Sequence, residues 1–146
     1  MTKCVFWLFA IGLLCGAEPP GDAAKKDLDR MQGEWRVEKA VRRGKDAPAA
    51  VRDKLSIAIS GSTITINDST EAREEKAEIT LDPSKTPANI DAVPTLPGSD
   101  RVLGIYKLEG DNLTICWNKG DGPRPGAFEI KPGTDVVLLV LKRAKK

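Results

Sequence analysis

Residues 55–67 decide the fold class of this chain; they read Leu-Ser-Ile-Ala-Ile-Ser-Gly-Ser-Thr-Ile-Thr-Ile-Asn. On either side of the Gly61-Ser62 pair, every second residue is leucine or isoleucine, and the residues between them are small or polar. A period of two is typical of a β-strand, because successive side chains point to opposite faces. The stretch therefore predicts two antiparallel strands joined by a tight turn.

Strand-like patterns recur along most of the chain, and turn signals separate them at intervals of about 8–12 residues. Further strands are predicted at residues 33–41, 71–81, 88–93, 102–108, 113–117, 127–130 and 136–141. Short helical turns are expected at residues 27–32 and 47–53. This pattern predicts an all-β fold, a small antiparallel barrel of about eight or nine short strands with a short N-terminal helical turn.

Residues 136–141 read Val-Val-Leu-Leu-Val-Leu, a run that is apolar on both faces. A strand of this kind packs on both sides, so we expect one face in the barrel interior and the other under a covering element. Leu28 and Met31 in the N-terminal turn are the candidates for that cover.

Residues 1–17 form a predicted signal peptide. Lys3 supplies a positive charge, residues 5–14 form an apolar run, and Cys15-Gly16-Ala17 offers small residues before a cleavage site. Lipid attachment at Cys15 is the less favoured alternative, because Leu14 stands where a lipoprotein needs a small residue. We expect export to the periplasm or beyond, with residues 18–26 as a flexible leader, 27–146 as one domain and no stable membrane insertion after cleavage.

The composition excludes several function classes. The 146 residues contain no histidine, which removes Ser–His and Cys–His nucleophile pairs and His-ligated zinc. The net charge of +2 is too balanced to predict nucleic-acid binding. After signal cleavage Cys116 is the only thiol, so no internal disulfide is possible, and with Ile115 and Trp117 beside it Cys116 is expected to be a buried apolar residue. A redox or nucleophilic cysteine is the alternative.

Two stretches resemble known families. Gly33-Glu34-Trp35, which opens a predicted strand after a helical turn, resembles the Gly-x-Trp motif of lipocalin-like barrels. The resemblance implies that Trp35 closes one end of the barrel under a basic residue of the last strand, and Lys142 and Arg143 stand where that residue would lie.

A longer series of motifs covers about residues 28–143. It comprises residues 31–35, 81–91 and 103–116, Arg124-Pro125 before Phe128, and the last strand with Arg143. This series resembles an exported, lipocalin-like domain family expanded in Planctomycetes, whose function is uncharacterised. The resemblance implies fold and export, and no catalytic residue. The motif residues that we expect to be structural are Gly33, Trp35, Tyr106, Arg124, Phe128 and Arg143.

Several polar clusters have both a chemical and a structural interpretation. The acidic series Glu71, Glu74, Glu75 and Glu78 lacks the glycine of a calcium loop, so a solvated edge strand is favoured over a metal site. Asp82 and Asp111 are expected to have turn roles, and a glycosidase-type carboxylate pair among Asp82, Asp91 and Asp111 is the alternative.

Two basic features complete the candidates. Arg124 is expected to bond loop carbonyls, or else to gate a barrel mouth or bind an anion. The basic end at residues 142–146 is expected to be a solvated tail, with contact to a polyanion as the alternative.

The functional expectation is an exported, non-enzymatic, lipocalin-like domain that holds a small apolar or amphipathic ligand in its barrel. We expect no catalytic residue, no metal ion and no cofactor. The alternative is a filled barrel that serves as a protein- or envelope-interaction module. An apolar void of at least ~300 Å³ would favour the ligand-binding function, and large side chains meeting in the middle would favour the filled module.

Overall fold

The computed structural model describes residues 21–119, 122–130 and 132–144. The predicted signal peptide, with Cys4 and Cys15, and the first residues of the predicted leader lie outside them. The helices are α1 (Asp22–Met31) and α2 (Ala49–Arg52). The strands are β1 (Gly33–Arg42), β2 (Lys45–Asp46), β3 (Leu55–Ser60), β4 (Thr63–Asp68), β5 (Arg73–Asp82), β6 (Ala88–Pro94), β7 (Val102–Glu109), β8 (Asn112–Asn118) and β9 (Val136–Arg143).

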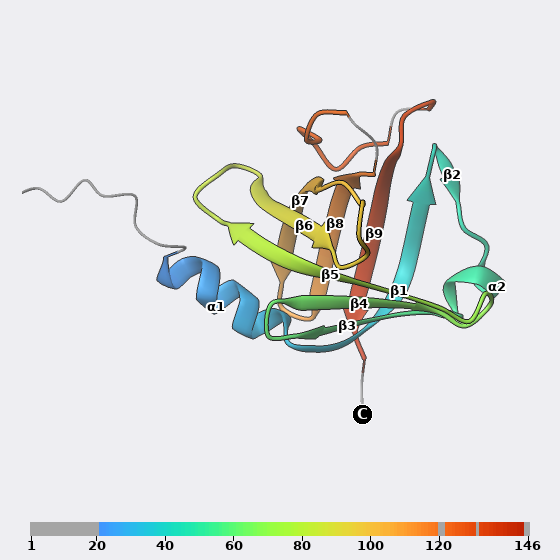
Figure 1. The fold of residues 1–146 in the computed structure, drawn as a ribbon, viewed down its shortest axis with the longest axis horizontal. Coiled ribbons are helices and arrows are strands. Elements are labelled where there is room, and N and C mark those ends of the chain that lie inside the picture. The colour runs from blue at the N-terminus through green and yellow to red at the C-terminus, as the bar shows by residue number, and fades with distance from the viewer. Residues whose placement is uncertain (1–20, 120–121, 131, 145–146) are drawn as a thin grey trace, which may run out of the picture.

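The strands form one closed antiparallel barrel, which confirms the predicted all-β, lipocalin-like fold. Each strand from β3 to β8 pairs with the strand that follows it in sequence, and β1 pairs with β3. The ring closes because β9, the last strand, pairs with β1 (Figure 1). The short β2 pairs only with the end of β1 and adds a ninth strand outside the eight-stranded ring. An open sheet would leave the backbone N–H and C=O groups of its edge strands unpaired, and closure of the barrel pairs them.

The alternation seen in the sequence sets which side chains fill the barrel. In the β3–β4 hairpin, Ile57 lies opposite Ile66 and Ile59 opposite Ile64, so both strands turn their branched side chains to the interior. The same parity places Leu113 on β8 and Leu141 on β9 opposite each other in the core.

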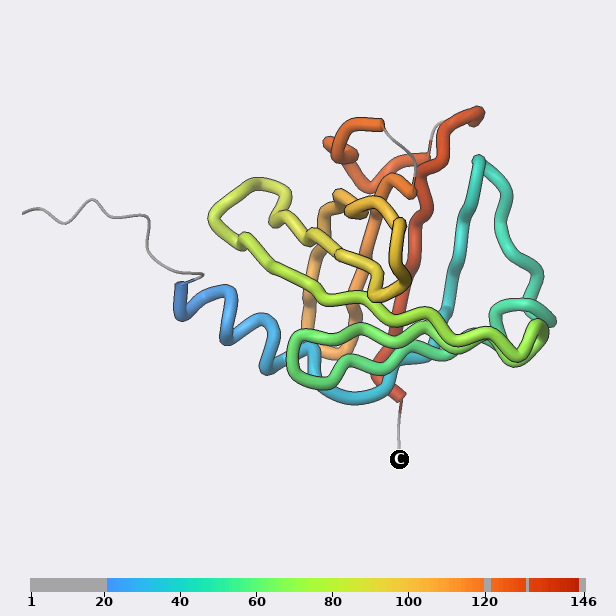
Figure 2. The backbone as a smooth tube through the Cα atoms, in the orientation of Figure 1, coloured from blue at the N-terminus to red at the C-terminus, as the bar shows by residue number. Residues whose placement is uncertain are grey.

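The register distinguishes two ends of the barrel. The closed end contains the start of β1, the end of β9 and the β3–β4 and β7–β8 turns. The opposite end, which we call the mouth, contains the end of β1, the start of β5 and the connection from β8 to β9. That connection passes beyond the strand ends at the top of the view in Figure 2.

Helix α1 is longer than the single turn predicted at residues 27–32. It begins at Asp22, so residues 22–26 are helical and the prediction that they belong to a flexible leader is wrong. Alanine and lysine have high helix propensity, and Asp22 lies in the first turn, where an acidic side chain interacts favourably with the helix dipole. Ala24, Leu28 and Met31 pack with the interior residues, so α1 does not cover the outer side of β9 as expected.

Two strand predictions also need correction. Residues 127–130 are not a strand, because β9 pairs with β1 and β8 and leaves no ladder for them to join. Residues 71–81 were expected to form an edge strand, yet β5 is bonded to β4 on one side and β6 on the other. Its outward glutamates are solvated as expected, but its inward residues face the barrel.

Candidate functional site at the mouth of the barrel

The closed end is built around Trp35, whose ring is 1% exposed. Its indole Nε1 donates a hydrogen bond to the Met31 carbonyl at 2.8 Å. The Arg143 guanidinium lies 4.5 Å from the ring centroid on the last strand, the place that the Gly-x-Trp resemblance implies for a basic residue. Lys142 instead is exposed. Gly33, Trp35 and Arg143 therefore meet at one point.

This cluster also terminates α1. Helix ends leave carbonyls without partners, and here Arg143 donates to the Gln32 carbonyl at 2.8 Å and to the Arg30 carbonyl. The Gln32 side chain donates to the Gly61 carbonyl at 2.8 Å and accepts from the Gly61 amide at 2.7 Å. The closed end therefore joins the helix, β1, the β3–β4 turn and β9 through matched donors and acceptors.

Gly33 is required at this junction for a backbone reason. Its φ of +114° is one that residues with a side chain rarely adopt. A Cβ built there would be only in ordinary contact with an Arg143 nitrogen, at 3.5 Å, so the backbone conformation and not a lack of space requires the glycine. The glycine of the motif thus lets the chain turn from α1 into β1 directly beside the guanidinium.

Tyr106 belongs to a separate contact nearby. Its hydroxyl donates to the Asp27 carboxylate of α1 at 2.6 Å, and the residue is buried. Burial, followed by the hydrogen bond that the hydroxyl donates to Asp27, raises the pKa of the Tyr106 phenol well above its usual value. The contact fastens the middle of the helix to the barrel interior.

At the mouth, the barrel contains two adjoining hollows of about 390 and 470 Å³, both open to solvent. The apolar residues of the first hollow are Ile64, Ile66, Ala77, Ala92, Val102 and Trp117, with Leu96 at its rim. Those of the second are Ala40, Leu55, Ile66, Val137, Leu139 and Trp117, among others. Five residues line both hollows, namely Ile66, Arg73, Glu75, Trp117 and Lys119.

Trp117 forms the shared floor and differs from Trp35 in one respect. The residue is 4% exposed, and its buried Nε1 has no hydrogen-bond partner among the described residues. Its position depends on Gly104 of β7, directly opposite it in the register. A Cβ on Gly104 would approach the Trp117 Cβ to 2.7 Å and the Cys116 carbonyl to 2.8 Å, so only glycine fits there.

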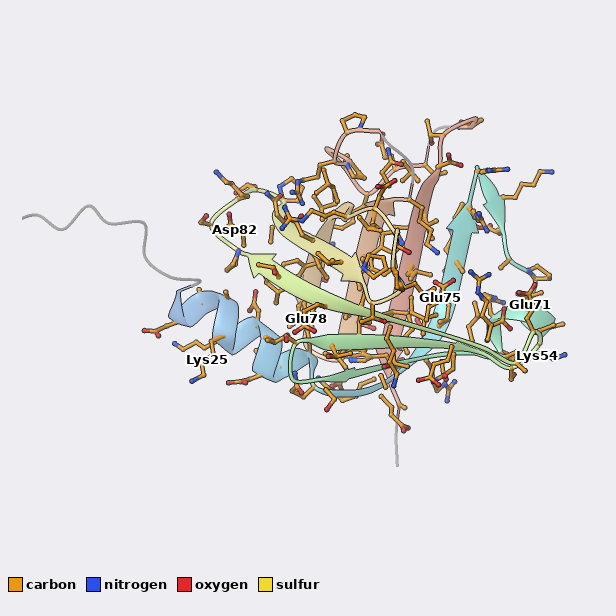
Figure 3. All side chains as sticks on the ribbon, viewed as in Figure 1. Lys25, Lys54, Glu71, Glu75, Glu78 and Asp82 are labelled. Carbon is orange, nitrogen blue, oxygen red and sulfur yellow. The ribbon has the colours of Figure 1, made fainter. Side chains whose placement is uncertain are left out.

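A chain of charges lies across the mouth beside this floor. Glu75 forms ion pairs with Arg73 at 2.6 Å and with Lys119 at 3.5 Å. Glu75 shares the inward face of β5 with Ala77 and Ile79, whereas Glu71 lies in the turn before the strand and Glu78 faces outward toward the hydroxyl of Ser62. Figure 3 shows Glu71 and Glu78 at well-separated points along this segment, with Glu75 between them.

The three candidate aspartates have separate partners. Asp82 accepts hydrogen bonds from the hydroxyl and amide of Ser84, and the hydroxyl bond is the main reason that its pKa is lowered. Asp91 pairs with Arg124 at 2.6 Å and Asp111 with Arg143 at 3.3 Å. None of the three lines either hollow, so they do not form a carboxylate pair at the mouth.

The remaining candidates are Cys116, Arg124 and Phe128. Cys116 is fully buried, and burial raises the pKa of its thiol to about 11, which disfavours the reactive thiolate. Arg124 donates to the carbonyl of Gly104 in β7 at 2.7 Å beside its ion pair with Asp91, so its carbonyl partner lies in a strand and not in a loop as predicted. Phe128 is half-buried in the β8–β9 connection.

Within the described residues, no group of three acidic, cysteine or histidine side chains is placed to hold a metal ion. No helix in these ranges has both the length and the apolar character needed to cross a bilayer.

Comparison of the chain with protein-family models, with curated proteins and with solved structures gave no significant match.

Glu75, Arg73, Lys119 and Trp117 were not singled out from the sequence as a site. Strand parity carries part of the signal, since Glu75 has the same parity as the apolar residues Ala77, Ile79 and Leu81 of the same predicted strand. Lys119 likewise has the parity of Ile115 and Trp117. A charged residue that has the parity of the buried face and lies near the end of a strand is therefore a sign of a barrel mouth.

Proposed function

We propose that this protein is an exported, non-enzymatic lipocalin-like domain that binds a small amphipathic ligand in the mouth of its barrel. The observation that carries the proposal is the pair of hollows of about 390 and 470 Å³ above the Trp117 floor. Small-molecule sites are usually apolar clefts of ~300–1,000 Å³ with a few polar groups. Export, and membership of the Planctomycetes-type family, rest on residues 1–17 and on the motifs of the mature chain.

The packing of the closed end favours a ligand that lies at the mouth and not deep in the interior. Met31, Trp35, Leu113 and Leu141 are each at most 1% exposed and fill the closed end. This packing also favours the second candidate, a filled barrel that binds a protein or envelope partner without a small molecule. The two functions differ in whether the mouth hollows hold a ligand.

Native mass spectrometry of the protein isolated from the cells that make it tests the proposal. We expect a co-purifying mass, and displacement of a fluorescent fatty-acid probe. An empty mass together with no probe binding would favour the filled module. The intact mass also tests export, because cleavage after Ala17 leaves a chain that begins at Glu18.

A matched pair of variants locates the site. Ala77→Leu places added carbons in the first hollow, which Ala77 lines, and should weaken probe binding about tenfold or more. Ala58→Leu is the control, because Ala58 is also half-buried but has the outward parity on β3, between Ile57 and Ile59. Equal effects of the two substitutions would place the probe elsewhere. A thermal melt of each variant confirms that it is folded.

A further inference from the structure

Resting on the proposed function, we infer that the ligand is an amphipathic acid, whose carboxylate lies against Lys119 and whose apolar body lies in the first hollow over Trp117. Two independent observations carry this assignment, one electrostatic and one from hydrogen bonding.

The first observation is the charge around Lys119. Its ammonium has a single ion pair among the described residues, with Glu75 at 3.5 Å. That carboxylate is already held by Arg73 through a shorter contact of 2.6 Å. An ammonium carries three donors, so Lys119 retains capacity for a second acceptor.

The charged residues that line the first hollow include one more base than acid. Its basic residues are Arg73, Lys76 and Lys119, and its acidic residues are Glu75 and Asp100. The second hollow is balanced, with four basic and four acidic residues (Arg42, Lys45, Arg73 and Lys119 against Asp46, Asp68, Glu71 and Glu75). In the first hollow Lys76 is held by Glu74 at 3.1 Å, so Lys119 is the cation that an anionic head would meet there.

The second observation is the indole of Trp117. Its Nε1 is a donor without a partner among the described residues, and a buried donor left unpaired is destabilising. Trp117 and Lys119 are two residues apart, so their side chains share one face about 7 Å apart along the chain. Lys119 offers only donors, which suits a carboxylate and disfavours an ammonium, and the Trp117 indole adds a buried, unpaired donor on the same face.

The apolar part of the ligand follows from the floor. Ala77, Ala92 and Val102 line the first hollow together with Trp117. Because the closed end is packed, the body of the ligand is confined to the mouth. A short aliphatic or single-ring acid fits this description.

Isothermal titration of the full protein with octanoate, octanol and octylamine tests the head group at constant chain length. We expect octanoate to bind about three- to tenfold more tightly than the other two, the range for a charge-assisted contact to a partly exposed lysine. Lys119→Gln should remove this preference and leave octanol binding unchanged. Lys107→Gln is the matched control, because Lys107 is an exposed residue of β7 that lines neither hollow.

A second variant should have the opposite effect on octanoate binding. Glu75→Gln removes the carboxylate that competes for Lys119, so it should tighten octanoate binding several-fold. Equal binding of the three compounds, or octanoate binding that survives Lys119→Gln intact, would overturn the assignment of the head group and leave the proposed function standing. Failure of all three to bind would instead overturn the proposed function itself.

Discussion

The two ends of the barrel each contain a buried, inward-facing tryptophan, and the two residues differ in how they are partnered. Trp35 donates to a carbonyl at 2.8 Å and lies beneath a guanidinium. Trp117 has an indole N–H with no partner among the described residues and borders two open hollows. The N–H of one tryptophan is paired within the closed end, and the other tryptophan borders the hollows with a buried donor that has no such partner.

The difference arises from what each end packs against. The closed end receives the C-terminus of α1, whose carbonyls accept from Trp35 and Arg143. At the mouth, the inward residues near the strand ends include charged side chains such as Glu75 and Lys119, which need water or a counter-charge. Stability is therefore concentrated at the closed end, and the capacity to bind is concentrated at the mouth.

The largest effect is expected from removing the closed-end ring. Trp35→Ala should lower the free energy of unfolding by about 3–5 kcal/mol, the usual cost of deleting a large buried aromatic. Urea denaturation of the purified protein measures it. A loss below ~1 kcal/mol would show that Trp35 does not hold the closed end together.

Much of this division could be predicted from the sequence. The alternation at residues 55–67 fixes the interior face of two strands, and the Gly-x-Trp resemblance implied a closing tryptophan beneath a basic residue of the last strand, where Arg143 lies. Both are local patterns, because a period of two and a motif of three residues are readable without knowing what packs against them.

The mouth could not be predicted in the same way. The contact of Lys119 with Glu75 joins residues 44 positions apart, and it depends on the barrel closing with a particular register. The full length of α1 was not predicted for a related reason. Ala24, Leu28 and Met31 lie on one face of the helix, and this face is apolar because the barrel buries it, which the sequence alone does not show.

The next largest loss of stability is expected from removing the Arg143 guanidinium that lies over Trp35. Arg143→Met keeps an apolar stem but removes the guanidinium, leaving the Arg30 and Gln32 carbonyls without their donor. Hydrogen bonds that involve a charged group contribute about 1.5–3 kcal/mol, so we expect a loss of about 2 kcal/mol in urea denaturation. Arg36→Met on the exposed side of β1 is the control and should change stability by less than about 0.5 kcal/mol. Similar losses in both variants would contradict a specific role for Arg143.

A smaller effect separates the two tryptophans directly. Trp35→Phe and Trp117→Phe remove the same atoms, but only the first leaves a buried carbonyl, that of Met31, without its donor. We expect Trp35→Phe to cost about 1–2 kcal/mol more than Trp117→Phe, the difference being the hydrogen bond. Equal losses of free energy in parallel urea titrations would remove the contrast between the two ends.

The smallest effect is expected at the mouth. Lys119→Gln breaks an ion pair of 3.5 Å between side chains that are 39% and 30% exposed, and solvent-exposed pairs of this kind contribute about 0–1 kcal/mol. We expect a change in unfolding free energy of less than about 0.5 kcal/mol, measured beside the loss of octanoate preference in the same variant. A lysine that matters to an acidic ligand and hardly at all to the fold is what a binding residue should be. A large loss of stability in Lys119→Gln would instead make the charge chain part of the scaffold, and the mouth would then resemble the closed end.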